Sequence, residues 1–311
     1  MSLLAIDFGG TRTRAAWFSA DLQLVARHET LSRVDQTPEE VIARMIDTAR
    51  QVVPDGAKIN AIGIAAPGPL DSERGIIHYV KTIPGWHEVP LAPQISAAFG
   101  GAPTFMQNDG NVAVLAEYHL GAARGCDPAI YLTISTGVGG GAVINGKLFS
   151  GAHGMAIEPG HQQFALPDGR LVRWEELTSG TAIGHIAKER LSMTDQPSSL
   201  RDVAAVDGKA VGEAAKAGDA FALGIIEEAG YWLGVGVVNL MHLFNPQVIV
   251  LGGSVSLLGD LILNPANRVI AERILHPDFN PTDLLKPAQL GDNVCLFGAA
   301  LYAQAQGTAT Q

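Results

Sequence analysis

Three glycine-rich turns, each following a short apolar run, constrain this 311-residue chain most strongly. They are DFGGT (7–11), STGVGGG (135–141) and LGGS (251–254). A short apolar run that ends in glycine predicts a buried strand followed by a tight turn. Glycine also lets backbone N–H groups approach phosphate oxygens, so such turns suit phosphate binding. Any one of them is also explained as an ordinary strand end, and only the set of three points to a ligand.

The order of the predicted elements indicates an α/β protein, because strands alternate with helices. A strand–turn–strand unit occurs at 4–18 and again at 130–149, which resembles an internal duplication. A third strand is expected around Asp21. The remaining expectations are a helix from Thr37-Pro38-Glu39-Glu40, helical segments at 175–191, 208–244 and from about 296, and a surface loop at 192–202.

Composition excludes several classes of protein. The net charge of −10, from 21 basic and 31 acidic residues, disfavours a nucleic-acid binder, which needs a basic surface. The two cysteines, Cys126 and Cys295, have no partner spacing and are predicted to be buried thiols in a reducing cytoplasm. Because Asp7 follows only a few apolar residues and no run approaches 20 apolar residues, neither a signal peptide nor a membrane span is expected.

Two common nucleotide-binding motifs are absent from the sequence. GxxxxGK[ST] does not occur, so the chain is not predicted to be a P-loop enzyme. The turn TGVGGG lacks the GxGxxG spacing, which disfavours a dinucleotide-binding fold.

Asp109, in QNDGNVAVLAEYHLG (107–121), has two interpretations from the residues alone. Asn, Asp and Gly are turn residues, and Asn111 is predicted to cap a helix over 112–120 that ends at Gly121. Alternatively, Asp109 accepts a proton from a substrate.

Seven motifs then identify a resemblance that covers nearly the whole chain. DFGGT, APGPL, NDGN, STGVGGG, GMAIEPGH, WEELTSG and VIVLGGS occur in the order seen in the ROK family of sugar kinases, within the actin-like ATPase superfamily. The resemblance implies a two-lobed, RNase H-like α/β fold with an interdomain cleft. The smaller lobe is expected at 1–115 plus 296–311, with the last helix crossing back to it, and the larger lobe at 116–295.

The resemblance also implies ATP-dependent phosphorylation of a hexose hydroxyl, with position 6 as the family expectation. Asp109 matches the general base of the family. Asp7 matches the acid that helps hold Mg²⁺ through water. The other matches are Gly68, Asn108, Glu158, His161 and Glu175 for the sugar, Gly9, Gly10, Thr11, Thr136 and Gly137 for phosphates, and Gly252 and Gly253 near adenosine. Purely structural roles remain as alternatives: a surface acid at Glu158, a core histidine at His161 and a helix-start acid at Glu175. Glu176 is the alternative candidate for the sugar-contacting acid.

The chain departs from the family at its zinc site. Most members carry CxCGxxGC between the histidine and the sugar-contacting Glu, but HQQFALPDGRLVRWEE (161–176) has no cysteine. Zinc is therefore not expected, since three of four ligands are missing. Packing of Phe164, Leu166, Leu171 and Trp174 is predicted to hold this segment instead.

A second departure affects the sugar. Family glucokinases often have NLPGW where this chain has Thr82 in KTIPGW, so this departure leaves open whether glucose is the preferred hexose. An N-acetylhexosamine or fructose kinase and a non-catalytic sugar-binding regulator are alternatives. A ROK repressor is disfavoured, because Asp7 leaves no room for a preceding helix-turn-helix. The resemblance implies a cytoplasmic homo-oligomer, a dimer or tetramer, whose partners are a sugar and ATP rather than nucleic acid or membrane.

Overall fold

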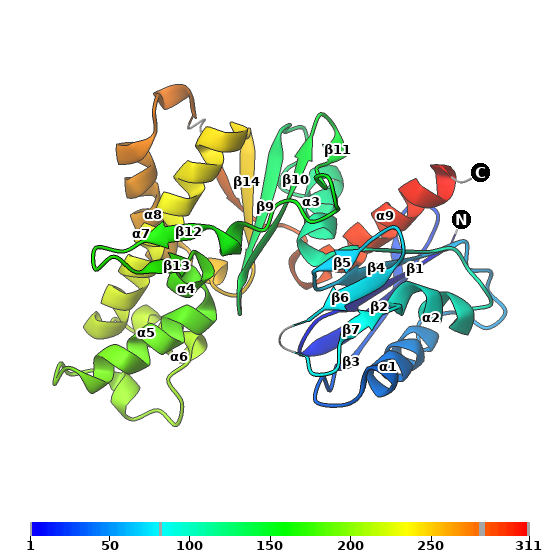
Figure 1. Cartoon of the computed structure of the whole chain (residues 1–311), viewed down its shortest axis with the longest axis horizontal. Helices are drawn as coiled ribbons and strands as arrows, with labels where there is room; N and C mark the ends of the chain where they lie inside the picture. The colour runs from blue at the N-terminus through cyan, green and yellow to red at the C-terminus, as the bar shows by residue number, and fades with distance from the viewer. Residues whose placement is uncertain (1, 81–82, 280–283, 310–311) are drawn as a thin grey trace. The chain divides into compact units, whose positions relative to one another are not determined.

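The computed structural model describes residues 2–80, 83–279 and 284–309. The chain forms two compact units (Figure 1). Unit 1 comprises Met1–Arg124, Leu148–Ala156 and Gln289–Gln311, and unit 2 comprises Gly125–Lys147 and Ile157–Ala288. The sequence-based lobe boundaries at 115/116 and 295/296 fall inside helices α3 (Asp109–Leu120) and α9 (Val294–Ala309), whereas the compact units keep both helices whole.

Unit 1 is built on a five-stranded sheet with the order β3-β2-β1-β4-β8. The strands are β1 (Leu3–Phe8), β2 (Arg12–Phe18), β3 (Leu24–Leu31), β4 (Ala61–Ala66) and β8 (Thr104–Asn108). The first three are antiparallel neighbours, while β1, β4 and β8 are parallel. The third strand begins later than predicted, because Asp21 lies in the turn before it, where it accepts a hydrogen bond from Ser19 Oγ at 2.6 Å.

Alternate residues of β1 pack into two different hydrophobic clusters, so both faces of this sheet are covered. Leu4 and Ile6 belong to the cluster that includes α1 (Pro38–Arg50) and α2 (Leu91–Ala98). Leu3 and Ala5 belong to the cluster formed with α9. As predicted, α1 begins after Thr37, whose side chain forms a reciprocal capping box with Glu40.

Within unit 1, helix α9 packs closely against the sheet and α3 at two glycines, and Figure 1 shows it along β1 and β4. A Cβ at Gly63 of β4 would lie 2.0 Å from Ala299 O, and one at Gly298 of α9 would lie 1.9 Å from Val112 O of α3. Larger side chains at these positions would separate α9 from the sheet and from α3. A small sheet of β5 (Leu70–Asp71), β6 (Ile76–Tyr79) and β7 (His87–Val89) completes the unit.

Unit 2 repeats the strand order of unit 1 as β11-β10-β9-β14-β15. The strands are β9 (Ala129–Ile134), β10 (Val138–Ile144), β11 (Lys147–Leu148), β14 (Val248–Gly252) and β15 (Leu285–Pro287). β1 and β2, like β9 and β10, form an antiparallel hairpin. β1 also pairs in parallel with β4, as β9 does with β14. The strand–turn–strand repeat predicted from the sequence is thus present as the β1–β2 and β9–β10 hairpins.

Helices of unit 2 enclose one large hydrophobic cluster. They are α4 (Glu175–Thr178), α5 (Gly180–Ser192), α6 (Gly208–Lys216), α7 (Ala220–Phe244) and α8 (Asp260–Arg273). The hairpin of β12 (Gln163–Ala165) and β13 (Leu171–Arg173) precedes α4. Short 3₁₀ turns occur at Pro159–His161, Ser199–Arg201, Ser256–Leu258, Pro277–Phe279 and Gly291–Asn293. Helix α7 is long and apolar enough to cross a membrane, but 61% of its most apolar window is buried, so its composition suits a core helix.

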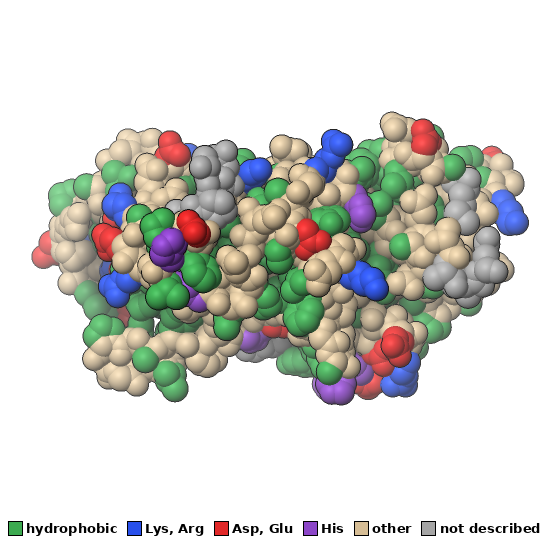
Figure 2. Space-filling model, turned by 90° about the horizontal axis from the view of Figure 1, so that it is seen from above, with side chains coloured by type: hydrophobic (Ala, Val, Ile, Leu, Met, Phe, Trp, Pro, Cys, Tyr) green, Lys and Arg blue, Asp and Glu red, His purple; other side chains and the backbone are tan. Residues whose placement is uncertain are grey.

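On the face shown in Figure 2, the side chains of the described residues carry acidic and basic groups interspersed with one another. No broad basic area is visible among them on this face. A polyanionic partner would need such a basic area, and the described residues of this one face do not supply it.

Candidate active site

The carboxyl ends of three parallel strands bring the predicted unit 1 residues to one edge of the sheet. Asp7 lies near the end of β1, Gly68 follows β4, and Asn108 ends β8. The registers place Asp7 opposite Ala65 and Ala66 opposite Asn108. Ligands of open α/β sheets bind beyond the carboxyl ends of the strands, so this edge is the expected position for a site.

Asp109 is the first residue of α3, directly after β8. The cap of this helix is Asn108, whose Oδ1 accepts the Gly110 N–H at 2.9 Å, and Asp109 Oδ1 accepts the same N–H at 2.7 Å. The prediction that Asn111 caps the helix is wrong. Asn111 is buried inside α3 and its Nδ2 donates to Gln107 Oε1 at 3.2 Å. The helix therefore begins three residues earlier than predicted, which places Asp109 at its positive end.

Asp7 is 5% exposed and pairs with Arg14, the residue directly opposite it on β2. Arg14 Nη1 donates to Asp7 Oδ2 at 2.9 Å. Burial raises the pKa of Asp7 above its usual value, and the adjacent Arg14 guanidinium opposes that rise. Arg14 was missed at the sequence level, because only the hairpin register brings it to Asp7.

The thiol of Cys295 lies close enough to Asp7 and Asp109 to be influenced by the charges of both acids. Burial raises the pKa of Cys295 well above its usual value, and the charges of Asp7 and Asp109 raise it further. Cys295 Sγ also donates to the backbone oxygen of Asp109 at 3.9 Å. Asp7 and Asp109 therefore lie near one thiol on α9. Both cysteines are only partly buried as whole residues, which corrects the expectation of two buried ones.

The turn formed by Gly9, Gly10 and Thr11 is held by hydrogen bonds to Arg12 of β2 and to Ser32, which follows β3. Gly9 N donates to Arg12 O at 3.0 Å, and Ser32 Oγ donates to Gly9 O at 2.6 Å. Gly10 has open space around its Cα and, like Thr11, is exposed. The backbone of this turn is thus fixed on one side and accessible on the other, as phosphate binding requires.

In unit 2, Glu158, His161 and Glu175 form one electrostatic group. Burial by surrounding protein raises the pKa of Glu158; the nearby His161 lowers it and Glu175 raises it again. Glu158 and His161 are nevertheless exposed as residues, so water reaches both side chains. A core role for His161 is therefore wrong. Glu175 begins α4 and is partly buried, with its Oε1 2.6 Å from Arg173 Nη1.

The second glycine turn lies beside this group. A Cβ at Gly137 would be 2.9 Å from Glu175 Oε2, so the turn and the carboxylate are in contact distance of each other. The turn is tied to its own strand by Ser135 N, which donates to Gly137 O at 2.9 Å, and to α5 by Gly180 N, which donates to Ser135 O at 2.7 Å. Thr136 is exposed.

A cavity of about 720 Å³ opens next to Thr136, large enough for a nucleotide. Its lining comes from the 135–136 turn, α5, α6 and the segment after β14. Gly252 and Gly253 lead into that segment, and each is required by packing: a Cβ would lie 2.0 Å from Tyr131 Oη and 2.4 Å from Ile134 O, respectively. The sequence did not indicate the lining residues of α5 and α6, which include Thr181, His185, Lys188, Lys209 and Lys216.

A family model for ROK proteins matches residues 3–306. The chain belongs to the ROK family. It is 32% identical over 311 residues to a glucokinase of Thermotoga maritima, with 96% of each chain covered. It superimposes on the ROK glucokinase of Streptomyces griseus, solved with glucose and AMPPNP, with a TM-score of 0.82 and 29% identity, covering 98% of this chain and 100% of that one. The ROK hexokinase of Thermus thermophilus gives a TM-score of 0.80 at 31% identity, covering 99% and 100%.

These comparisons confirm the resemblance drawn from the seven motifs. They also confirm the two-lobed actin-like ATPase fold, which agrees with the repeated strand order of the two sheets.

In this ROK protein the β12–β13 hairpin occupies the segment that carries zinc ligands in most of the family. Trp174 is fully buried after β13, and its Nε1 donates to Trp232 O at 2.8 Å. Phe164 is buried 6.4 Å from the Trp174 ring, measured between centroids. Leu166 packs against the same cluster, but Leu171 is 69% exposed, so its predicted packing role is wrong. Among the described residues no group of three or more His, Cys, Asp or Glu side chains could hold a metal ion.

The unit 1 edge nevertheless fits magnesium that arrives with a nucleotide. Mg²⁺ keeps several waters and commonly needs only one or two carboxylates besides the substrate phosphates. Asp7 would supply such a carboxylate, and its Oδ2 already accepts a hydrogen bond from Arg14. Its position next to the 9–11 turn is consistent with a water-mediated role.

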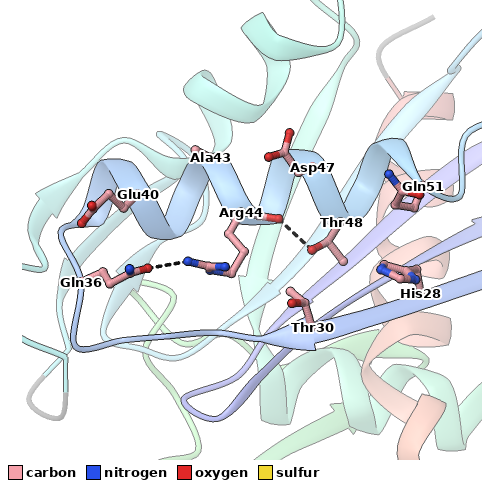
Figure 3. Close-up of a pocket in the computed structure, with 9 residues that line it drawn as sticks. All are labelled: His28, Thr30, Gln36, Glu40, Ala43, Arg44, Asp47, Thr48 and Gln51. Carbon is pink, nitrogen blue, oxygen red and sulfur yellow. Dashed lines mark hydrogen bonds between the residues drawn. The ribbon is translucent and has the colours of Figure 1, made fainter.

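A separate polar groove of about 450 Å³ lies between α1 and β3 of the ROK protein (Figure 3). Arg44 donates through Nη2 to Gln36 Oε1 at 2.5 Å, and Thr48 Oγ1 donates to Arg44 O at 2.7 Å. The groove contains none of the predicted site residues. One of these bonds joins two side chains and the other ends on a backbone carbonyl of α1.

Proposed function

We propose that this ROK protein is a sugar kinase that transfers the terminal phosphoryl group of ATP to a hexose hydroxyl, with Asp109 as general base. The observation that carries this proposal is the position of Asp109 at the start of α3, at the same sheet edge as Asp7 and the 9–11 turn. The similarity to glucokinases over nearly the whole chain supports it.

The chemistry requires a base because a sugar hydroxyl is a poor nucleophile. As the hydroxyl oxygen forms its bond to the γ-phosphorus, the bond to the β-phosphate oxygen breaks and ADP leaves. The hydroxyl proton passes to a carboxylate, which is the role of Asp109. Its place at a helix N-terminus stabilises the negatively charged form.

Sugar recognition is assigned to Gly68 and Asn108 of unit 1 and to Glu158, His161 and Glu175 of unit 2. Carboxylates and amides suit sugar hydroxyls because each hydroxyl both donates and accepts hydrogen bonds. A site built in this way rejects analogues that leave its polar groups unpaired.

ATP is assigned to the 720 Å³ cavity and the glycine turns. Gly9, Gly10, Thr11, Thr136 and Gly137 would hold phosphates through backbone N–H groups and hydroxyls, with Gly252 and Gly253 near the adenosine. Magnesium, held through water by Asp7, would neutralise charge on the phosphates.

The identity of the hexose and the hydroxyl stay predictions. Position 6 of glucose or a related hexose is the first choice, and N-acetylhexosamines and fructose are the alternatives. Thr82, on which the departure from glucose was argued, lies outside the described residues. A cytoplasmic location and a homo-oligomer likewise remain proposals.

The test is a coupled ADP-release assay with glucose, mannose, fructose, N-acetylglucosamine and N-acetylmannosamine, in wild type and Asp109→Asn. We expect turnover with at least one sugar and a loss of about 10²- to 10⁴-fold in kcat for Asp109→Asn, with sugar binding by calorimetry retained. Asp21→Asn, an exposed turn acid of unit 1, is the control. Near-wild-type turnover of Asp109→Asn would remove the base assignment, and sugar binding without any turnover would favour a non-catalytic regulator.

A further inference from the structure

We propose that Arg173 is a positioning residue that fixes the carboxylate of Glu175 for sugar binding. This inference rests on the proposed function, because it takes Glu175 as a sugar ligand. Arg173 is the last residue of β13, and Glu175 is the first residue of α4. Neither composition nor any motif of the sequence singles out Arg173.

Each oxygen of the Glu175 carboxylate has a defined neighbour. Oε1 is 2.6 Å from Arg173 Nη1. Oε2 lies against the 136–137 turn, since a Cβ at Gly137 would be 2.9 Å from it. The carboxylate is thus held between a guanidinium on one side and a glycine turn on the other.

Arg173 is itself held from two directions. Its backbone N–H donates to Glu176 Oε2 at 2.7 Å, and its Nη2 donates to Glu176 Oε1 at 3.4 Å. The next residue, Trp174, is fully buried, and its backbone N–H donates to Gln162 O at 2.9 Å. The backbone and the guanidinium of Arg173 are therefore both fixed.

The local charges explain why such a residue is needed. Glu158 and Glu175 are close enough to repel each other electrostatically. Without a cation, Glu175 would gain by rotating away from Glu158 and into solvent. Arg173 offsets this repulsion and keeps Glu175 in one conformation before the sugar arrives, which reduces the cost of ordering it on binding. Arg173 also engages the carboxylate of Glu176, the alternative sugar-contacting acid suggested by the sequence.

The first test compares Arg173→Met with Arg170→Met. Arg170 belongs to the same hairpin, and its Nε donates to Asp168 Oδ2 at 2.7 Å. Both side chains are exposed, and this ion pair does not include Glu175. For Arg173→Met we expect the KM of the sugar to rise about tenfold, with kcat and the KM of ATP within about twofold of wild type. Arg173→Lys, which keeps the charge but not the fork geometry, should recover part of the loss. Arg170→Met should change none of these constants.

The second test is a double-mutant cycle with Glu175→Gln. Because Arg173 acts through Glu175, Arg173→Met should add less than about twofold to the KM of the sugar in the Glu175→Gln background. Independent, multiplying effects would overturn the proposal. So would an equal loss in Arg173→Met and Arg170→Met, or a fall in kcat alone.

A crystallographic comparison separates this inference from the function on which it rests. If the wild-type protein neither phosphorylated nor bound any of the sugars, the proposed function would fail. The structures of wild type and Arg173→Met, or of Arg173→Lys if the first variant does not fold, would still show whether the Glu175 carboxylate depends on Arg173. An unchanged Glu175 conformation in the variant would contradict the positioning role, and a displaced carboxylate would support it.

Discussion

Asp7 and Arg14 face each other across the β1–β2 hairpin, with 2.9 Å between Asp7 Oδ2 and Arg14 Nη1. The Asp7 side chain is 8% exposed and that of Arg14 is 21% exposed, so the pair is largely removed from water. A buried carboxylate is costly without a partner, and here the sheet register supplies one. The pair therefore stabilises the end of β1 that carries the first glycine turn.

Arg14→Met is expected to lower the free energy of unfolding by about 2 to 3 kcal/mol, because it leaves Asp7 buried without its cation. Urea unfolding followed by circular dichroism measures the change. Arg12→Met is the control on the same strand: Arg12 pairs with Glu29 but its side chain is 52% exposed, so about 0.5 kcal/mol or less should be lost. Equal losses in the two variants would show that the buried pair has no special weight.

Gly236→Ala is expected to destabilise unit 2 and to weaken sugar binding. The added Cβ would lie 2.0 Å from the ring of the fully buried Trp174, which precedes Glu175, the residue proposed to contact the sugar. Overpacking of this kind costs about 1 to 3 kcal/mol, measurable as a lower Tm together with a raised KM for the sugar.

Gly224→Ala, in the same helix α7, is the matched control for Gly236→Ala. Its Cβ would meet nothing within 4 Å, so the helix should gain about 0.5 to 1 kcal/mol from the better helix former. A Gly236→Ala variant as stable as Gly224→Ala would contradict the packing described around Trp174.

Asp219→Ala is expected to destabilise the start of α7 in a pH-dependent way. Burial alone would raise the pKa of Asp219, but hydrogen bonds from Ala222 N–H and from Ser199 and Ser198 lower it to about 2. A depressed folded-state pKa stabilises the protein above the unfolded value of 3.8, and this contribution is lost as pH falls toward 2.

The Asp219→Ala deficit should therefore be about 1 to 2 kcal/mol at pH 7 and should shrink between pH 4 and pH 2. Denaturant unfolding at several pH values measures it. Asp278→Ala is the control, because the Asp278 side chain is 92% exposed. A deficit that stayed constant down to pH 2 would be incompatible with the low pKa.

Chelation is expected to stop turnover without unfolding the protein. EDTA removes the magnesium that accompanies ATP, whereas the β12–β13 segment is held by Phe164 and Trp174 in the unit 2 core. Tm measured with and without EDTA should agree within about 1 °C, and excess Mg²⁺ should restore turnover. A marked fall in Tm with EDTA, or recovery only after zinc is added, would show that a structural metal holds this segment.

The sequence predicted the elements whose signals are local. The Thr37–Glu40 capping box fixed the start of α1, and the glycine turns marked the ends of β1, β9 and β14. The start of α3 was misplaced because NDGN offers two asparagines as caps. The choice between Asn108 and Asn111 depends on Gln107, which bonds to Asn111 inside the unit.

Other features depend on residues that are distant in sequence or on tertiary packing. The buried Glu117 accepts N–H groups of Ala122 at 2.7 Å, Gln289 at 2.9 Å and Leu290 at 3.0 Å, two of them more than 170 positions away. Helix α8 was not predicted, because Pro265 lies inside it; the proline packs where a Cβ at Gly230 would come within 2.5 Å. The ion pair of Arg173 with Glu175 likewise appears only once the hairpin and α4 are built.

The contacts of Glu117 and α9 have a consequence for the order in which the protein matures. On the face of the unit 1 sheet that supports α3, the described residues of α9, including Leu296, Ala299 and Ala303, pack together with Val112 of α3. During translation these residues leave the ribosome after all of unit 2. Until then, the helix that begins at Asp109 lacks its contacts with α9. Phosphoryl transfer thus requires the segment that follows unit 2, and a nascent chain arrested before residue 289 would be inert toward ATP and sugar.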